Sequence, residues 1–283
     1  MFKQKRQVFI LLLSIISAQL KAQNLEIGLM GGGSYYYGDV VTELKYQDVR
    51  YSGFMFFRKT IDNHLSLRLN LGYVRIVGID SIASTKFQYN RNLNFFTDIY
   101  EVSVQGEYSL VDQIAKSKSR NKGLIPYVYG GLGLCYFIPQ AIIKGKVYNL
   151  AALETSGYKY SQVAIVMPIG IGVRYHLTKR LQIGIEAGLR LTSTSELDDI
   201  KGGSVYADPA KLKSDDSRLA YYRGRTSVDP DTGWGTGITG KVRGKVNYIT
   251  DVYMVYGLTL SYVVGPVGKS HFLHTKGGCP RFY

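Results

Sequence analysis

The chain has 283 residues and contains little of several residue types that would indicate other classes of protein. It has two Cys, which excludes a disulfide-stapled domain and a zinc site built from cysteine alone. Its 32 Gly show no period of three, which excludes a collagen-like repeat. With 20% charged and 45% hydrophobic residues, it is not a disordered chain. Few Cys, Pro and Trp beside 24 Tyr are typical of many short strands and few long helices.

Motifs for catalysis and nucleotide binding are also missing. The chain has four His and contains no H-E-x-x-H or G-x-S-x-G motif, and no G-x-x-x-x-G-K that is followed by Ser or Thr. Lipid-cleaving barrels use His with Ser and an acid, but the sequence places no such triad around His64 or His176. We therefore expect no enzymatic activity, no cofactor and no small-molecule substrate.

The first residues have the pattern of an export signal. Three basic residues within the first six are followed by the apolar run 8–16 and by Ala22, with a possible cleavage before Gln23. A run of about nine residues is too short to span a bilayer as a helix, and no later stretch approaches the ~18 apolar residues required. We expect residues 1–22 to be a signal peptide. The exported chain is then either soluble outside the cytoplasm or a β-barrel.

Alternation of apolar and polar residues predicts eight strands. In the clearest cases, such as residues 64–74 and 180–192, apolar side chains occupy every second position and polar ones fall on the opposite face. The predicted strands are residues 25–37, 51–61, 64–74, 99–110, 125–137, 163–177, 180–192 and 252–264.

Strand length and connections favour a membrane barrel over a secreted β-sandwich, which is the soluble alternative. Most of these strands have about 11 to 15 residues, whereas soluble strands usually have 5–6 and membrane strands need about 9–11. Short connections alternate with long ones, as periplasmic turns alternate with outer loops. The short connections are residues 61–63, 111–124 and 178–179, and the long ones are 38–50, 77–94, 138–160 and 193–251.

Aromatic residues lie near the predicted strand ends. They cluster in residues 35–37, 95–96 and 136–137. Aromatic side chains at both membrane interfaces are typical of membrane barrels. We expect these clusters to belong to interfacial girdles.

The polar faces of the strands predict a filled lumen. An eight-stranded barrel is just wide enough inside to hold its own side chains. Opposite charges there are expected to pair as a polar plug, which makes a conducting pore or an ion path a poor interpretation. The predicted lumen residues are Arg68, Glu101, Gln105, Glu107, Arg174, Gln182, Glu186 and Arg190.

Ion sites and nucleic acid are weakly supported. Asp198 and Asp199, with Asp208 nearby, suit calcium in residue type but lack an ordered ligand spacing, so we expect a solvated loop with local turn caps. His271, His274 and Cys279 lack a fourth zinc ligand nearby. The basic residues are spread out, and for an exported barrel they suit anionic lipid headgroups or an acidic protein rather than nucleic acid.

The tail after the last strand is the least routine feature. Residues 266–283 should emerge in the periplasm and end in Cys279-Pro280-Arg281-Phe282-Tyr283. Cys135 is expected near the outer end of its strand, too far from Cys279 for a disulfide, which needs Cα atoms within ~7 Å. We interpret Cys279 as a candidate crosslink to a partner, with an unpaired thiol in a frayed terminus as the alternative.

Several segments resemble one family. Residues 26–39 carry the pattern E-x-G…Y-x-G-D, and residues 197–212 carry L-D-D…Y-x-D-P…L. Arg243-Gly244 before the closing strand also fits, although residues 251–254 lack the tryptophan usual there, which leaves paralogues open. In these features the chain is similar to the PorG-like outer-membrane barrels of the type IX secretion system in Bacteroidetes.

This resemblance implies a non-enzymatic subunit that attaches the periplasmic ring of the secretion system, a lipoprotein and its partner, to the outer membrane. The tail and inner turns would be the docking surface. We thus expect a signal peptide (1–22), an all-β, eight-stranded antiparallel transmembrane barrel in the outer membrane (23–265) and a periplasmic tail (266–283). The alternatives are an adhesin using the loop 193–251, a lipid-modifying enzyme and a small porin.

Overall fold

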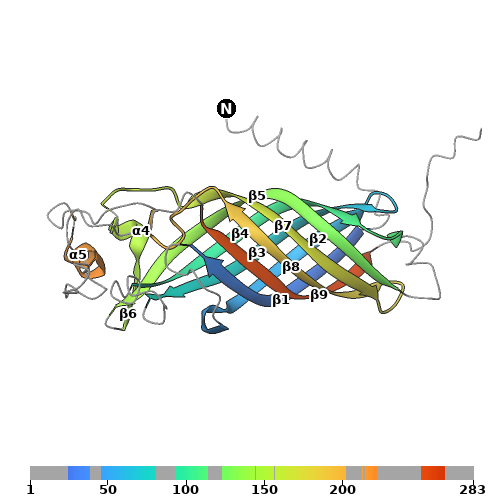
Figure 1. Ribbon diagram of the computed structural model, residues 1–283, viewed down its shortest axis with the longest axis horizontal. Helices are drawn as coiled ribbons and strands as arrows, with labels where there is room; N and C mark the ends of the chain where they lie inside the picture. The colour runs from blue at the N-terminus through green and yellow to red at the C-terminus, as the bar shows by residue number, and fades with distance from the viewer. Residues whose placement is uncertain are drawn as a thin grey trace, which may run out of the picture.

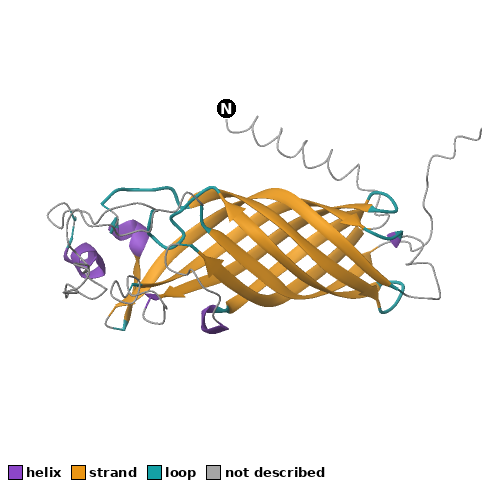
Figure 2. Cartoon of the chain, in the orientation of Figure 1, coloured by secondary structure: helices purple, strands orange, loops and turns teal. Residues whose placement is uncertain are grey.

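The computed structural model describes residues 25–38, 46–80, 93–113, 123–143, 145–155, 157–201, 212, 214–221 and 250–264. Eight long strands form a barrel, and the shorter elements lie beyond one of its ends or beside it (Figures 1 and 2). The barrel strands are β1 (Leu25–Tyr37), β2 (Arg50–Thr60), β3 (Leu65–Ile79), β4 (Asn94–Ser109), β5 (Leu124–Ile143), β7 (Val163–His176), β8 (Leu181–Thr192) and β9 (Val252–Val264). The short elements are η1 (Tyr46–Asp48), β6 (Lys146–Asn149), α4 (Leu150–Leu153) and α5 (Asp215–Tyr221).

Each barrel strand pairs antiparallel with the strands before and after it in the chain, counting the barrel strands alone. The first and last strands close the ring, with Leu25 opposite Val264 and Tyr37 opposite Val252. The extra strand β6 pairs only with residues 140–143 at the far end of β5. Closure leaves no unpaired edge, which a β-structure needs in hydrocarbon because no water is present to bind free N–H and C=O groups. The predicted eight-stranded antiparallel barrel is confirmed.

Three strands extend further than the sequence predicts. Residues 77–79 and 94 belong to β3 and β4, and residues 138–143 belong to β5, so the predicted loops 77–94 and 138–160 are too long. In β3 the alternation is lost because Ile76, Val77 and Gly78 are all buried. In β5, Pro139 argues against a strand, but β5 has already passed the end of β7 there, so the missing N–H removes no bond to that neighbour.

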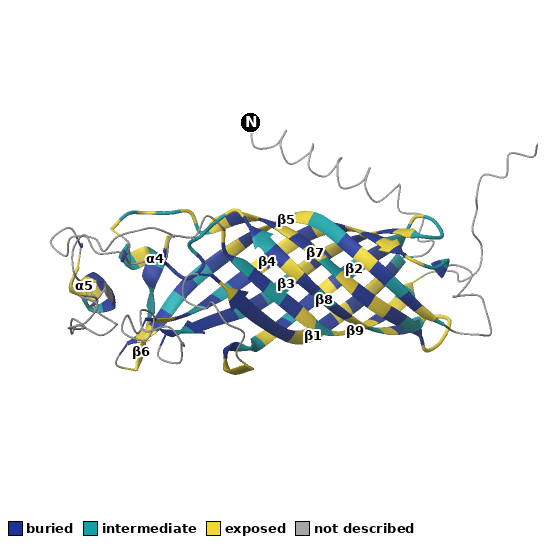
Figure 3. Ribbon diagram, in the orientation of Figure 1, coloured by how far each residue is buried: buried dark blue, intermediate teal, exposed yellow. Residues whose placement is uncertain are grey.

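Burial in the barrel is the inverse of that in a soluble protein. Figure 3 shows exposed and buried residues alternating along the strands. In β3, Leu67, Leu69 and Leu71 are exposed, while Arg68 and Asn70 between them are buried. The same inversion holds in β4, where Val102 and Val104 face outward. An apolar outer face with a polar interior is the arrangement that a lipid surround favours.

Two rings of tyrosine border the apolar outer face. The outer girdle comprises Tyr51, Tyr73, Tyr100, Tyr136 and Tyr256. In the strand register Tyr100 lies opposite both Tyr73 and Tyr136, and Tyr51 and Tyr256 both lie opposite Gly33. The inner girdle comprises Tyr108, Tyr175 and Tyr262. On β4, Tyr108 follows Tyr100 by eight positions, which at ~3.4 Å per residue and a tilt of about 40° corresponds to roughly 20 Å of membrane.

Part of the predicted girdle lies inside the barrel instead. Tyr36, Phe95 and Phe137 are at most 2% exposed, and the rings of Tyr36 and Phe95 meet edge to face at 5.2 Å. Their positions share the inward face of their strands, so they pack in the outer mouth. Phe96 and Tyr136, one position away, face outward as predicted.

Aromatic rings inside the barrel pack directly over glycines on neighbouring strands. A Cβ added to Gly72 would lie 2.1 Å from the ring of Phe54, and one added to Gly172 would lie 2.5 Å from that of Tyr127. Glycine is therefore required at these inward positions, because the ring occupies the space that any side chain would need. Among the described residues, none of the helices has the length and hydrophobicity needed to cross a bilayer.

The contrast between inward and outward glycines predicts unequal effects of one substitution. Gly72→Ala places a methyl group against Phe54, whereas Gly31→Ala on the outer face meets nothing within 4 Å. We expect Gly72→Ala to lower the free energy of unfolding by about 1–3 kcal/mol, and Gly31→Ala to change it little. Urea unfolding of the refolded chain in lipid vesicles measures both. Equal unfolding midpoints for the two variants would contradict this packing.

Candidate functional site

The lumen holds four arginines and four glutamates that are buried on the described strands. They come from β1 to β4, β7 and β8 and point into one interior, and each is at most 4% exposed. They are Glu26, Arg58, Arg68, Glu101, Glu107, Arg174, Glu186 and Arg190. Equal numbers of opposite charges make this set formally neutral, which a low-dielectric interior favours.

Glu107 is the centre of the largest charge cluster. Its Oε2 lies 2.7 Å from Arg58 Nε and 2.8 Å from Arg174 Nη1, and its Oε1 lies 3.3 Å from Arg68 Nη1. The Glu107 side chain is 0% exposed. One carboxylate therefore compensates three guanidinium groups that come from three other strands.

The remaining glutamates complete the charge balance. Arg68 Nη1 lies 2.7 Å from Glu186 Oε2, and Arg58 Nη1 donates a 2.6 Å hydrogen bond to Glu26. At the other end of the network, Glu101 Oε2 lies 3.7 Å from Arg190 Nε and accepts a 2.9 Å hydrogen bond from the hydroxyl of Tyr253. Because every arginine of the set faces a carboxylate, none of these buried charges is isolated.

Aromatic rings fill the space between the charges. The guanidinium of Arg68 lies 4.0 Å from the ring centre of Phe56, and that of Arg174 lies 4.7 Å from that of Tyr127. Such contacts are attractive because the ring face is electron-rich. Together with the ion pairs, they make the described lumen a packed interior and not an aqueous channel.

Sequence reasoning named six of these charged residues and missed Glu26 and Arg58. The structure places Arg68, Glu101, Glu107, Arg174, Glu186 and Arg190 in the lumen, and it buries Gln105 and Gln182 there too. Glu26 on β1 and Arg58 on β2 occupy inward positions. Their neighbours Ile27 and Phe57 are on the outward face of the same strands. The alternation of these strands, followed to their ends, is the signal that could have found them.

The inner end of the barrel is closed by Gln113. Its backbone N–H donates to Asn63 O at 2.9 Å, its Nε2 donates to Asp62 O at 2.9 Å, and its Oε1 accepts from Arg174 Nη2 at 2.5 Å. Asn63 also donates to Asp112 at 2.8 Å. These bonds join the turn between β2 and β3 to residues 112–113, and they connect both to the lumen network.

The turn between β2 and β3 is fixed by Asp62. Its carboxylate accepts hydrogen bonds from the backbone N–H groups of His64, at 2.8 Å, and Leu65, at 2.7 Å. These two bonds hold the pKa of Asp62 below its usual value. The charged form, present above the unfolded pKa, therefore stabilises the turn, and that contribution is lost as the pH falls through the lowered pKa.

The outer mouth is closed by residues 194–200, which we call the outer plug. Leu197 and Ile200 are 0% exposed. The backbone N–H of Leu197 donates to Asp251 Oδ2 at 2.9 Å, and the carbonyl of Leu197 accepts from the hydroxyl of Thr97 at 2.5 Å. The plug is thus attached to β4 and to the residue that precedes β9.

The acidic pair in the plug is buried, so the expected solvated loop is wrong. The hydroxyl of Tyr36 lies 2.9 Å from Asp198 Oδ2 and 2.8 Å from Asp251 Oδ1, and Tyr160 donates to Asp199 at 2.9 Å. Asp199 also accepts from Thr155 and has a φ of 64°. Both carboxylates therefore hold the plug in place, while Asp208 lies outside the described residues.

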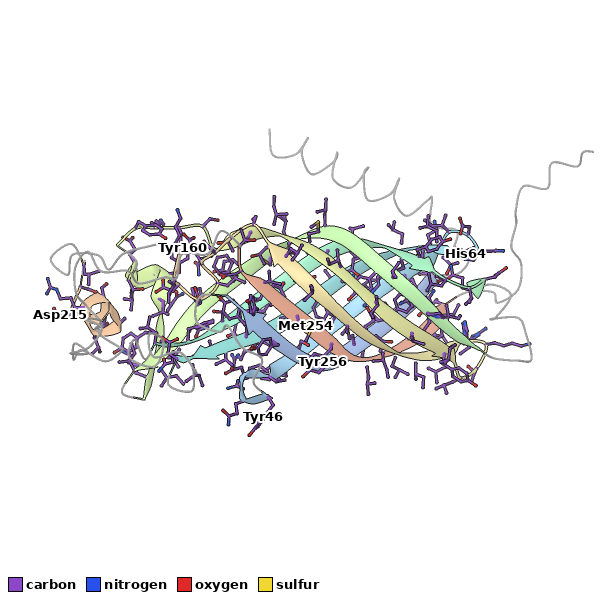
Figure 4. The ribbon with its side chains drawn as sticks, viewed as in Figure 1. Tyr46, His64, Tyr160, Asp215, Met254 and Tyr256 are labelled. Carbon is purple, nitrogen blue, oxygen red and sulfur yellow. The ribbon has the colours of Figure 1, made fainter. Side chains whose placement is uncertain are left out.

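Other predicted sites are placed as follows. His64 Nδ1 lies 2.8 Å from Ser109 O and its ring stacks on Tyr108, at the end of the barrel opposite Tyr160 and Asp215 (Figure 4). His176 is buried in β7, and Cys135 is a buried free thiol. The described part of the chain contains no group of three or more His, Cys, Asp or Glu side chains that could hold a metal ion. Outside it lie the predicted signal peptide, residues 1–22, and the predicted docking tail with Cys279, Pro280, Arg281, Phe282 and Tyr283.

Residues 5–211 match the model of a protein family described as a domain of unknown function (DUF6089). The chain belongs to the DUF6089 family. No curated protein matches it significantly.

Similar solved structures include the following three. Neisserial surface protein A is 11% identical (TM-score 0.41; 84% of this chain and 96% of that chain covered). Ail of Yersinia pestis, in complex with the heparin analogue sucrose octasulfate, is 10% identical (0.38; 84% and 97%). The N-terminal β-barrel domain of Pseudomonas aeruginosa OprF is 11% identical (0.36; 85% and 97%). Because these TM-scores are low, the barrel fold is assigned from the strand pairing within this chain and not from these similarities.

This DUF6089 member is an outer-membrane β-barrel. The ring of strands is closed, its outer face is apolar, and tyrosine girdles border that face on both sides. A closed barrel with this surface is the form in which β-strands span the outer membrane. The end with short turns faces the periplasm, and the end with α4, α5 and the outer plug faces outward.

The position of Glu107 predicts a large effect of removing its charge. Glu107→Gln leaves Arg58, Arg68 and Arg174 without their shared carboxylate, so we expect a loss of about 3–5 kcal/mol in the free energy of unfolding. Asp215→Asn, which removes an exposed ion pair with Arg218, should change it by less than about 0.5 kcal/mol. Urea unfolding in lipid vesicles compares them, and a Glu107→Gln midpoint at the wild-type value would disprove the central role of this carboxylate.

The contacts of Asp251 predict that it keeps the outer plug closed. Asp251→Ala removes the acceptor for Leu197 N–H and a partner of Tyr36, a loss of about 1–3 kcal/mol. We expect limited proteolysis of the folded barrel within residues 194–201 to become at least about fivefold faster. Lys179→Ala, an exposed change in the turn between β7 and β8 and outside the cleaved segment, is the control. Unchanged cleavage in Asp251→Ala would show that the plug is held by other contacts.

Proposed function

We propose that this barrel is a non-conducting, non-enzymatic anchor that docks the periplasmic ring of the type IX secretion system to the outer membrane. The observation that carries the proposal is the filled lumen: neutral ion pairs and aromatic rings occupy the interior, and Gln113 and the outer plug lie at its two ends. A barrel filled in this way is available for function through its ends and its lipid-facing surface.

The inner end has the properties of a docking platform. Its turns are held by the hydrogen bonds of Gln113, Asn63 and Asp62, so a partner would meet a preorganised surface. Ile61 and Leu110 at these turns are each more than half exposed. Exposed apolar groups on a fixed surface favour association, because burying them costs little conformational entropy.

The resemblance to PorG-like barrels adds the identity of the partner. The L-D-D part of the loop pattern, Leu197-Asp198-Asp199, forms the buried centre of the outer plug. Because this pattern has a packing role, we expect barrels that share the same architecture to carry it. We infer that the partners are the ring lipoprotein and its companion, contacted by the inner turns and by the tail 266–283, with Cys279 as a crosslink candidate.

An adhesin is the second candidate. The outer end carries α4, α5 and β6 beyond the barrel (Figure 1), and Tyr46 of η1 is 85% exposed. An adhesin would bind through this end, so a change there would abolish its function and leave ring assembly intact. The two candidates therefore predict opposite results for changes at the two ends.

Affinity purification from the native membrane tests the anchor. The full chain should recover the periplasmic ring proteins, and recovery should fall at least about tenfold without residues 266–283 or with Ile61→Asp and Leu110→Asp combined. Tyr46→Ala at the outer end is the matched control and should recover them in full. If truncation alone leaves recovery unchanged, the tail has no docking role. If the full chain recovers no ring proteins, the anchor function is wrong.

A further inference from the structure

A groove on the lipid-facing surface lies directly outside the outer tyrosine girdle. It has a volume of about 500 Å³, and its lining includes Arg50, Tyr51, Arg75, Val77, Phe96 and Ile142 from β2 to β5. Arg75 follows the girdle residue Tyr73 by two positions on β3, so both side chains face outward. The groove is therefore at the level of the lipid headgroups of the outer leaflet.

Arg75 is held rigidly on one side of this groove. Its Nε and Nη2 donate to the two carboxylate oxygens of Asp98 at 2.6 and 2.8 Å, and Asp98 also accepts from Tyr73 and Gln140. The guanidinium lies 5.2 Å from the ring centre of Phe96 and 5.6 Å from that of Tyr51. This arrangement fixes the guanidinium plane and leaves Nη1 outside the pair with Asp98.

Arg50 supplies a second guanidinium at the groove. Its Nη1 donates to the backbone carbonyls of Gln47 and Val49, both at 2.8 Å, and among the described residues no carboxylate forms an ion pair with it. Among the described residues around the groove, Arg50 and Arg75 against Asp98 leave one net positive charge. Val77, Phe96 and Ile142 make part of the lining apolar, and Asn94 adds a polar side chain.

We propose that this groove binds the phosphorylated headgroup of an outer-leaflet lipid, the chemical class that includes the lipid A part of lipopolysaccharide. Planar guanidinium groups match the geometry of phosphate oxygens, and Arg50 and Arg75 offer donors at the level of the headgroup. The apolar part of the lining suits the faces of headgroup sugars. The acyl chains of the lipid would extend from the groove towards the centre of the bilayer, over Tyr51, Tyr73 and the apolar outer face of the barrel. This inference does not depend on the proposed anchor function.

The binding of bisphosphorylated lipid A to the purified full chain in detergent micelles tests the proposal. We expect Arg50→Gln to weaken binding at least about fivefold and Arg50→Gln with Arg75→Gln at least about tenfold. Arg180→Gln is the matched control, because Arg180 is an exposed arginine that donates to Tyr262 of the inner girdle. It should bind as the wild type does. Dephosphorylated lipid A should bind weakly and equally to all four proteins.

Arg50→Gln keeps the test decisive if loss of Arg75 prevents folding, because the side-chain hydrogen bonds of Arg50 within the described residues go to the backbone carbonyls of Gln47 and Val49. Heat-dependent mobility on gels shows that each variant is folded. The proposal is overturned if folded Arg50→Gln binds bisphosphorylated lipid A as tightly as wild type, or if Arg180→Gln loses as much affinity. It is also overturned if dephosphorylated lipid A binds the wild type equally well, or if inorganic phosphate displaces the lipid at equal concentration.

Discussion

Four guanidinium groups and four carboxylates share the inside of one narrow barrel, and their mutual compensation is the constraint on which the rest of the structure depends. Charges away from water are tolerated when they are paired and hydrogen-bonded. Because the outer face must be apolar to meet lipid, the strands can place their polar residues only inward. Glu107, shared by Arg58, Arg68 and Arg174, shows how tightly that interior is coupled.

The same constraint determines where function can reside. Ion pairs and rings occupy the lumen, so the proposed anchor function uses the ends of the barrel and its lipid-facing side. At the inner end, Gln113 connects the turns to the lumen through Arg174, so the proposed docking platform is bonded to the barrel beneath it. On the lipid-facing side, the groove around Arg75 is fixed by Asp98 in the same way.

Much of the fold could be predicted because membrane strands alternate over long stretches. The bounds of β1 and β9 agree with the sequence prediction, and those of β2, β7 and β8 differ by one residue. The outer plug could not be predicted, because Asp198 and Asp199 are buried by residues distant in sequence such as Tyr36 and Tyr160. The arginine groove was missed because it forms where β3 and β4 extend beyond the predicted strands 64–74 and 99–110.

The central claim is that the interior is packed and does not conduct, and ion conductance tests it most directly. The purified full chain, inserted into planar lipid bilayers at neutral pH, should give no steady ohmic current steps at applied potentials of either sign. Reproducible open-channel steps from the folded protein, rising linearly with voltage, would contradict the sealed lumen and with it the account of an anchor.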